Sequence, residues 1–224
     1  MYRSLLVAAL AFAATPASAA SLSATLTAAS DYLYDGVSQT EDNAAAQGSL
    51  DLSFENGFYI GAWASNVDFG ADDNTSAEID YYAGFARELE SGWGYDLGIS
   101  QITYVGGPSE YDYTEVYAGL TFPTGTGAQV WFADDDEVFG GSTWRAKLTH
   151  SFELTETVSL DVEATRTHYS DSSAENFNHF QFGFSKTLNE VFSAYLGYSD
   201  TSLDDEPRAD GRVLFNITAS FDIF

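Results

Sequence analysis

The chain has 224 residues, and its 34 acidic and 8 basic side chains give a formal net charge of −26. This charge repels nucleic-acid phosphates, and the lack of cysteine excludes disulfides, thiol nucleophiles and thiolate metal sites. Three histidines leave little for a histidine-based metal site, and we expect no cofactor. An apolar share of 45% is ordinary for one folded domain, but an aromatic share of 16% is high.

The first 19 residues have the pattern of a secretory signal peptide. Arg3 supplies a positive start, residues 5–14 form an apolar run, and Ala17-Ser18-Ala19 matches an A-x-A cleavage site. The apolar run is too short for a helix that spans a bilayer. We therefore expect cleavage after Ala19 and a mature chain that forms one domain over residues 20–224.

From Ser21 onward, apolar residues recur at every second position, which predicts β-strands with one apolar and one polar face. No amphipathic helix competes with this pattern. Twelve candidate strands follow in chain order, at residues 22–28, 50–54, 58–64, 79–85, 93–99, 116–122, 128–132, 144–152, 158–164, 180–184, 192–198 and 213–223.

The connections between these strands alternate between two kinds. Short, turn-like connections, several of them rich in Gly, fall at residues 55–57, 90–92, 123–127, 153–156 and 187–190. Longer polar connections, where much of the acid is concentrated, cover roughly residues 36–45, 70–77, 105–112, 134–142, 169–176 and 201–211. Strict alternation places the long loops at one end of the structure and the short turns at the other.

Bacterial outer-membrane barrels combine short periplasmic turns, longer outer loops and an even number of strands. Lipid explains the apolar face of each strand, an aqueous lumen explains the polar face, and interfacial girdles explain the aromatic surplus. Three basic residues on the lipid-facing side, Arg87, Arg166 and Lys186, fall at strand ends, from which they can reach lipid phosphates. The sequence thus predicts an all-β fold, an antiparallel transmembrane β-barrel of 12 strands. A soluble exported sandwich would not sort its loops in this way.

The stretch Ser30-Asp31-Tyr32-Leu33-Tyr34-Asp35-Gly36-Val37-Ser38-Gln39 resembles the opening of the TorF-family porins, which are exported proteobacterial proteins of similar length. Further matches follow at residues 57–69, 78–84 and 113–119, so the resemblance is specific over about residues 30–122. Asp35 stands where the family usually has Arg, and Val105 replaces a usual Pro. The resemblance implies an outer-membrane barrel that acts as a diffusion channel, but it supplies no substrate.

The polar positions of the alternating strands predict an inner wall on which acidic residues outnumber basic residues. The candidate pore-lining residues are Asp51, Glu78, Asp80, Asp96, Glu115, Arg145, Lys147, Asp161 and Glu163. Carboxylates in a pore lower the energy of cations, so we expect cation preference. The alternative role for individual acids is cross-strand pairing, which across the turn at 153–156 would place Lys147 near Glu163.

The expected width of the lumen follows from the number of strands. Twelve strands lie between the filled barrels of eight strands and the open porins of sixteen, so the channel should be narrow. The sequence does not decide whether side chains or an inward-folded loop close it. Glycines on the inner parity favour an uncrowded interior, with strand bends or close packing as alternatives; they are Gly61, Gly84, Gly98, Gly119, Gly183 and Gly197.

The predicted function is a narrow, cation-preferring channel for passive diffusion of small hydrophilic solutes. Its expected partners are outer-membrane lipids, lipopolysaccharide, small solutes and cations, and no nucleic acid. The acidic loops provide either a solvated surface or a means of concentrating cations at the mouth.

One alternative function is a closed barrel with a structural or adhesive role. Another is an outer-membrane lipid hydrolase that uses His168 and Ser170, two residues that share one face of a strand. The Asn-Gly that follows this pair in such phospholipases is replaced here by Asp171-Ser172, so we do not predict an enzyme.

Overall fold

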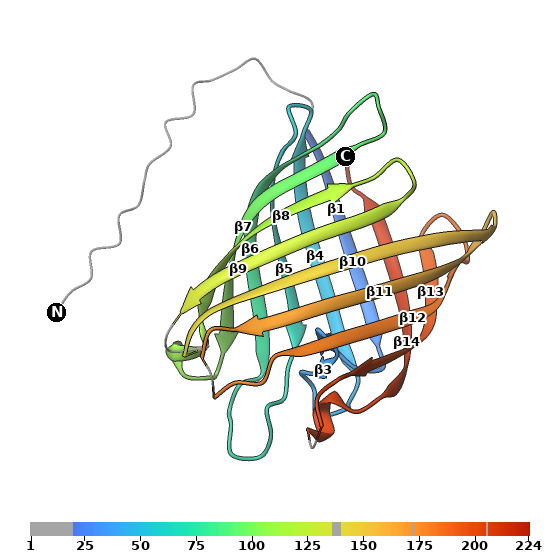
Figure 1. Ribbon diagram of the computed structural model, residues 1–224. Helices are drawn as coiled ribbons and strands as arrows, with labels where there is room; N and C mark the ends of the chain where they lie inside the picture. The colour runs from blue at the N-terminus through green and yellow to red at the C-terminus, as the bar shows by residue number, and fades with distance from the viewer. Residues whose placement is uncertain (1–19, 136–139, 172, 205) are drawn as a thin grey trace, which may run out of the picture.

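A computed structural model describes residues 20–135, 140–171, 173–204 and 206–224 (Figure 1). The predicted signal peptide therefore lies outside the described residues. The described residues form a closed barrel of twelve antiparallel strands, β1 (Ala20–Ala29), β4 (Ala45–Phe54), β5 (Phe58–Asn66), β6 (Ala77–Glu88), β7 (Gly94–Val105), β8 (Tyr113–Thr121), β9 (Thr126–Asp135), β10 (Gly141–Thr155), β11 (Val158–Tyr169), β12 (Phe177–Thr187), β13 (Phe192–Thr201) and β14 (Arg212–Asp222).

Among the described residues, four smaller elements lie outside the barrel wall. Two short strands, β2 (Leu33–Tyr34) and β3 (Val37–Ser38), pair with each other. Single turns of 3-10 helix occur at η1 (Ser109–Tyr111) and η2 (Pro207–Ala209). No helix long and apolar enough to cross a membrane is found in the part of the chain that the structure describes.

Each strand of the barrel pairs with its neighbour in chain order, and β1 pairs with β14 to close the ring. The closing register runs from Ser23 opposite Asp222 to Ala29 opposite Asn216. Closure leaves no strand edge unpaired, as lipid surroundings would require. The predicted antiparallel barrel of 12 strands is confirmed.

The two kinds of connection lie at opposite ends of the barrel, as predicted (Figure 1). The end with the tight connections, which also carries the start of β1 and the C-terminus, is called here the turn end, and the other the long-loop end. The turn between β4 and β5 shows why Gly is needed there. Gly57 has a φ of 93°, and a Cβ at this position would lie 2.6 Å from the carbonyl oxygen of Ala86.

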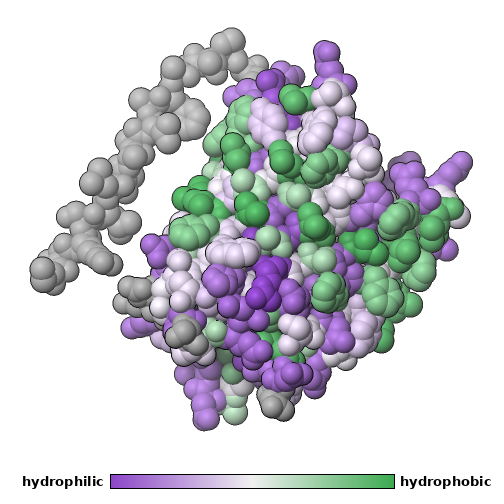
Figure 2. Space-filling view, viewed as in Figure 1, coloured by the Kyte–Doolittle hydropathy of each residue, from purple (hydrophilic) through white to green (hydrophobic). Residues whose placement is uncertain are grey.

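Apolar side chains cover the outer face of the barrel. Leu50, Leu97 and Phe180 are more than half exposed, although residues of these types are usually found inside soluble proteins. Figure 2 shows hydrophobic side chains gathered over the flank of the barrel near β10 to β13, and hydrophilic side chains around the long-loop end. This arrangement confirms the predicted parity of the strands, with their apolar faces outward.

Tyrosine rings lie over glycines on the inner face. A Cβ on Gly61 would lie 2.4 Å from the ring of Tyr82, and a Cβ on Gly84 would lie 2.4 Å from the ring of Tyr59. Tyr117 covers Gly98 in the same way, and Tyr195 covers both Gly183 and Gly197. At these positions the prediction of an uncrowded interior is wrong, because each glycine leaves room for an aromatic ring. The alternative, that the glycines allow close packing, is confirmed.

Candidate functional site

The connection between β1 and β4 does not remain an outer loop but folds into the lumen. Residues 30–44, here called the inner hairpin, carry β2 and β3, and their Ser38 and Thr40 are fully buried. Both hydroxyls donate hydrogen bonds of 2.7 Å to the same carboxylate oxygen of Asp31, which ties the two arms together. The expectation of a loop at residues 36–45 outside the barrel is therefore corrected, because buried hydrogen bonds hold this segment inside.

The tip of the inner hairpin is a tight turn at Asp35 and Gly36, both with positive φ, of 47° and 88°. Gly36 faces β12 and β13, where a Cβ would lie 2.6 Å from the ring of His179 and 2.5 Å from Thr201. Only glycine can bring the backbone this close to the wall. The tip therefore reaches the side of the barrel formed by the C-terminal strands.

Arg145 on β10 holds the tip by charge. Its Nη1 lies 3.4 Å from Oδ2 of Asp35, and its Nη2 donates a 2.8 Å hydrogen bond to Oε2 of Glu115 on β8. Thr167 on β11 donates a further 3.0 Å hydrogen bond to Asp35. All of these side chains are buried. Breaking a buried group of ion pairs such as this one is strongly destabilising, because removal of one partner leaves a buried charge that is not neutralised.

Aromatic rings complete the surroundings of the guanidinium. Arg145 lies 4.5 Å from the ring centre of Tyr34 on the inner hairpin and 4.6 Å from that of Trp131 on β9. Both distances fall in the range of cation–π contacts. The hydroxyl of Tyr113 donates to that of Tyr34 at 3.5 Å. Sequence reasoning placed Arg145 on the inner wall but did not find these partners.

Two further predicted acids, Glu78 and Asp80, lie on β6. Glu78 is 3% exposed and accepts a 2.8 Å hydrogen bond from the hydroxyl of Tyr32 on the inner hairpin. Oδ1 of Asp80 is buried and has no hydrogen-bond partner within the described residues. The long-loop half of the interior thus contains several carboxylates around one arginine.

Lys147 and Glu163 form an ion pair of 2.8 Å across β10 and β11, which confirms the expected cross-strand contact. His179 approaches the same carboxylate oxygen of Glu163 at 3.4 Å. These side chains form the second charged group of the interior, and its one lysine is already paired.

The remaining predicted acids accept hydrogen bonds from neutral hydroxyl groups. Asp51 accepts from Tyr82, Asp96 accepts from Tyr59 at 2.7 Å, and Asp161 accepts from Ser151 at 2.6 Å. Hydroxyl donors stabilise a carboxylate but leave its negative charge in place. Like Glu78 and Asp80, these three acids, on β4, β7 and β11, form no ion pair with a base within the described residues.

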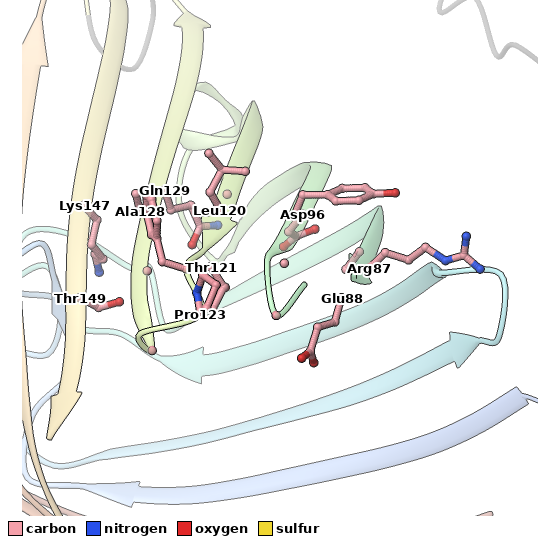
Figure 3. Close-up of a pocket in the computed structure, with 18 residues that line it drawn as sticks. Arg87, Glu88, Asp96, Leu120, Thr121, Pro123, Ala128, Gln129, Lys147 and Thr149 are labelled. Carbon is pink, nitrogen blue, oxygen red and sulfur yellow. The ribbon is translucent and has the colours of Figure 1, made fainter. Parts of the chain in front are cut away.

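A cavity of about 720 Å³ opens at the turn end (Figure 3). Asp96 projects from β7, Gln129 from β9, and Lys147 and Thr149 from β10, whereas the guanidinium of Arg87 extends away from these side chains. The turn-end half of the interior therefore contains an open space whose wall carries an acid, an amide and a lysine.

His168 and Ser170 do not form a nucleophile–base pair. The ring of His168 packs at 5.2 Å against Trp144 on the outer face, and Oγ of Ser170 accepts a 2.8 Å hydrogen bond from the backbone N–H of Ser142. Within the described residues, no hydrogen bond joins His168 to Ser170. The hydrolase hypothesis lacks the contact that it needs.

A family model described as "Bacterial protein of unknown function (Gcw_chp)" matches residues 13–221. The chain belongs to this family. The description of the Gcw_chp family assigns no function, and it does not support the TorF name suggested by residues 30–122. A comparison with curated proteins found no match.

Solved structures of porins resemble this member of the Gcw_chp family in fold. The KdgM porin has a TM-score of 0.59 at 11% identity, over 89% of this chain and 99% of that one. The NanC porin has a TM-score of 0.60 at 10% identity, over 88% and 98% of the two chains. A KdgM porin in complex with disordered oligogalacturonate has a TM-score of 0.55 at 10% identity, over 90% and 99%. The fold is that of outer-membrane porins.

Proposed function

We propose that the chain is an outer-membrane channel for passive diffusion of small hydrophilic solutes, with a narrow lumen and a preference for cations. The observation that carries this proposal is the division of the barrel into an apolar outer face and an inner wall dominated by acids. In a bacterial outer membrane the turn end would face the periplasm and the acidic long loops the outside. The porin fold supports the same function.

Cation preference follows from which inner charges are neutralised. The two inner bases, Arg145 and Lys147, each lie beside at least one carboxylate. Asp51 and Asp96 accept hydrogen bonds from tyrosine hydroxyls and form no ion pair with a base within the described residues. A permeating cation would therefore meet negative charge that protein cations do not cancel, and an anion would be repelled.

The narrowness of the lumen follows from the position of the inner hairpin. Its tip contacts Arg145 on β10, while Tyr32 reaches Glu78 on β6 and lies 5.2 Å from the ring centre of Trp63 on β5. At its base, Asp31 pairs with Arg212 at 2.7 Å on β14. Contacts with so many strands favour a second candidate as well, a barrel closed by this segment that has a structural or adhesive role.

Conductance in planar bilayers tests both candidates. The refolded mature chain should give discrete current steps, with a reversal potential under a salt gradient that shows cation selectivity. Anion-selective steps would keep the channel but overturn the selectivity. A barrel that is folded by circular dichroism yet silent under all voltages would overturn the channel and favour the closed barrel.

A further inference from the structure

A second cavity, of about 550 Å³, lies at the long-loop end. The inner hairpin contributes Tyr34 to its lining, and most of the remaining wall comes from aromatic residues of other loops and strands. Phe69 comes from the connection between β5 and β6, Tyr104 from β7 and Tyr111 from η1. None of these three rings was assigned a role by the strand pattern. They are called here the aromatic corner.

The three rings of the aromatic corner are inclined to one another. Phe69 lies 5.5 Å from Tyr104 at an interplanar angle of 58°, and 6.0 Å from Tyr111 at 62°. Tyr104 and Tyr111 are 6.2 Å apart and almost perpendicular, at 89°. Rings arranged in this way present surfaces in different directions rather than one flat platform. Aromatic walls of this kind surround a compact group such as a substituted ammonium.

The charge beside the aromatic corner is negative. The carboxylate of Asp73 accepts hydrogen bonds from the hydroxyl of Tyr111 at 2.9 Å and from the backbone N–H of Thr75 at 2.7 Å. Hydrogen bonds from Thr75, and to a smaller degree the one from Tyr111, lower the pKa of Asp73, so it is ionised at neutral pH. The base in the lining, Arg208, lies 3.3 Å from Glu206 and 4.0 Å from Glu41. The basic residue in the described lining of the cavity is thus already next to two carboxylates, so the cavity is poorly suited to an anion.

A ring in the lining of this cavity already holds a cation. The guanidinium of Arg145 lies 4.5 Å from the ring centre of Tyr34, which borders the cavity. Arg145 itself is buried and paired with Asp35 and Glu115. The interior thus uses cation–π contacts for its own structure, and the aromatic corner supplies further rings beside a carboxylate.

We propose that the aromatic corner binds a small alkylammonium cation, with the substituted nitrogen against Phe69, Tyr104 and Tyr111 and its charge balanced by Asp73. A quaternary ammonium suits ring faces because it cannot donate hydrogen bonds and is weakly hydrated. A metal ion would require several oxygen ligands, which these rings do not provide. This proposal names a class of solute for the proposed channel. It depends on the channel function only in treating the long-loop end as the mouth through which solutes enter.

Direct binding tests the proposal without any measurement of current. Calorimetry of the refolded mature chain in detergent would use tetramethylammonium and choline as probes, with 3,3-dimethylbutan-1-ol as the uncharged analogue of choline. The two cations should bind with saturation, and the alcohol about tenfold or more weaker, which corresponds to about 1.4 kcal/mol. Equal binding of the alcohol, or no saturable binding of either cation, would overturn the proposal, as would saturable binding of a neutral sugar alone.

Matched variants locate the site. Phe69→Leu and Asp73→Asn should each weaken tetramethylammonium binding about tenfold, within the range of cation–π and charge-assisted contacts. Both residues lie in a loop, so the barrel should still fold. Tyr95→Leu is the control, since this ring stacks on Phe85 at the turn end, and it should bind as the parent does. Unchanged binding in both loop variants would refute the site. If binding fails while cation-selective conductance persists, the channel stands and only this site is lost.

Discussion

Arg145 and Asp35, 110 positions apart in the chain, meet inside the barrel at 3.4 Å. The contact joins a wall strand to the tip of the inner hairpin, and both side chains are buried. Because Asp35 also accepts a hydrogen bond from Thr167, two neighbouring strands hold the tip through one carboxylate. The position of the inner hairpin therefore depends on Asp35 more than on any other single side chain of its tip.

Asp35→Asn should loosen the inner hairpin and widen the channel. The amide keeps the size of the side chain but removes the charge that attracts Arg145, which retains Glu115. Single-channel conductance should rise and become noisier, and the inner hairpin should become sensitive to protease added on the long-loop side. Glu156→Gln is the control, because it removes one charge from an exposed turn that does not contact the inner hairpin. Equal conductance in the parent and Asp35→Asn would contradict the assigned role.

Arg145→Gln should destabilise the folded barrel by about 3–5 kcal/mol, because Asp35 and Glu115 would remain buried without their cation. The midpoint of urea unfolding in lipid vesicles measures this loss. Lys147→Gln should cost less, because the Lys147–Glu163 pair is more exposed. In the double variant with Asp35→Asn, the loss should be smaller than the sum of the single losses, since the two residues interact. Strict additivity would show that they do not.

The strand pattern predicted the barrel wall because alternation has a direct physical cause, namely lipid on one side of each strand and a polar interior on the other. The inner hairpin was not predicted, since its strands are two residues long and show no periodicity. One signal was available. Asp35-Gly36 is a pair of residues typical of tight hairpin turns. The alternation of polar and apolar residues placed Arg145, Glu115 and Glu78 on the inner wall. It could not show that side chains of a loop would form ion pairs and hydrogen bonds with them.

Gly61→Ala should destabilise the barrel by about 1–3 kcal/mol, because the new methyl group would lie 2.4 Å from the ring of Tyr82 and would displace it. Urea unfolding measures the effect. Gly119→Ala is the matched control, since its Cβ would meet Gln129 at an ordinary 3.6 Å. A combined Gly61→Ala and Tyr82→Leu variant should recover part of the loss. If the two glycine variants were equally stable, the tyrosine rings would not require the glycines beneath them.

The hydrogen bond from the hydroxyl of Tyr111 to the carboxylate of Asp73 should persist at mildly acidic pH. Hydrogen bonds lower the pKa of Asp73 in the folded state, so its contribution is complete above the ordinary carboxyl pKa and is lost only as pH falls through the lowered value. An NMR titration of the Tyr111 ring signals should therefore show its transition below the pH at which an unperturbed aspartate titrates. Asp73→Asn should abolish that transition. A Tyr111 transition at the ordinary aspartate pKa would contradict the hydrogen bonds to this carboxylate.

Neutralising the uncompensated acids should reduce cation selectivity without loss of the fold. Asp51 and Asp96 accept hydrogen bonds from tyrosine hydroxyls, which an asparagine oxygen can also accept. In the variant with both Asp51→Asn and Asp96→Asn, the reversal potential under a salt gradient should move towards zero, while the unfolding midpoint should change little. Glu156→Gln removes one charge from an exposed turn outside the lumen and should leave the potential unchanged. An equal shift in this control would assign selectivity to the net charge of the molecule rather than to its inner wall.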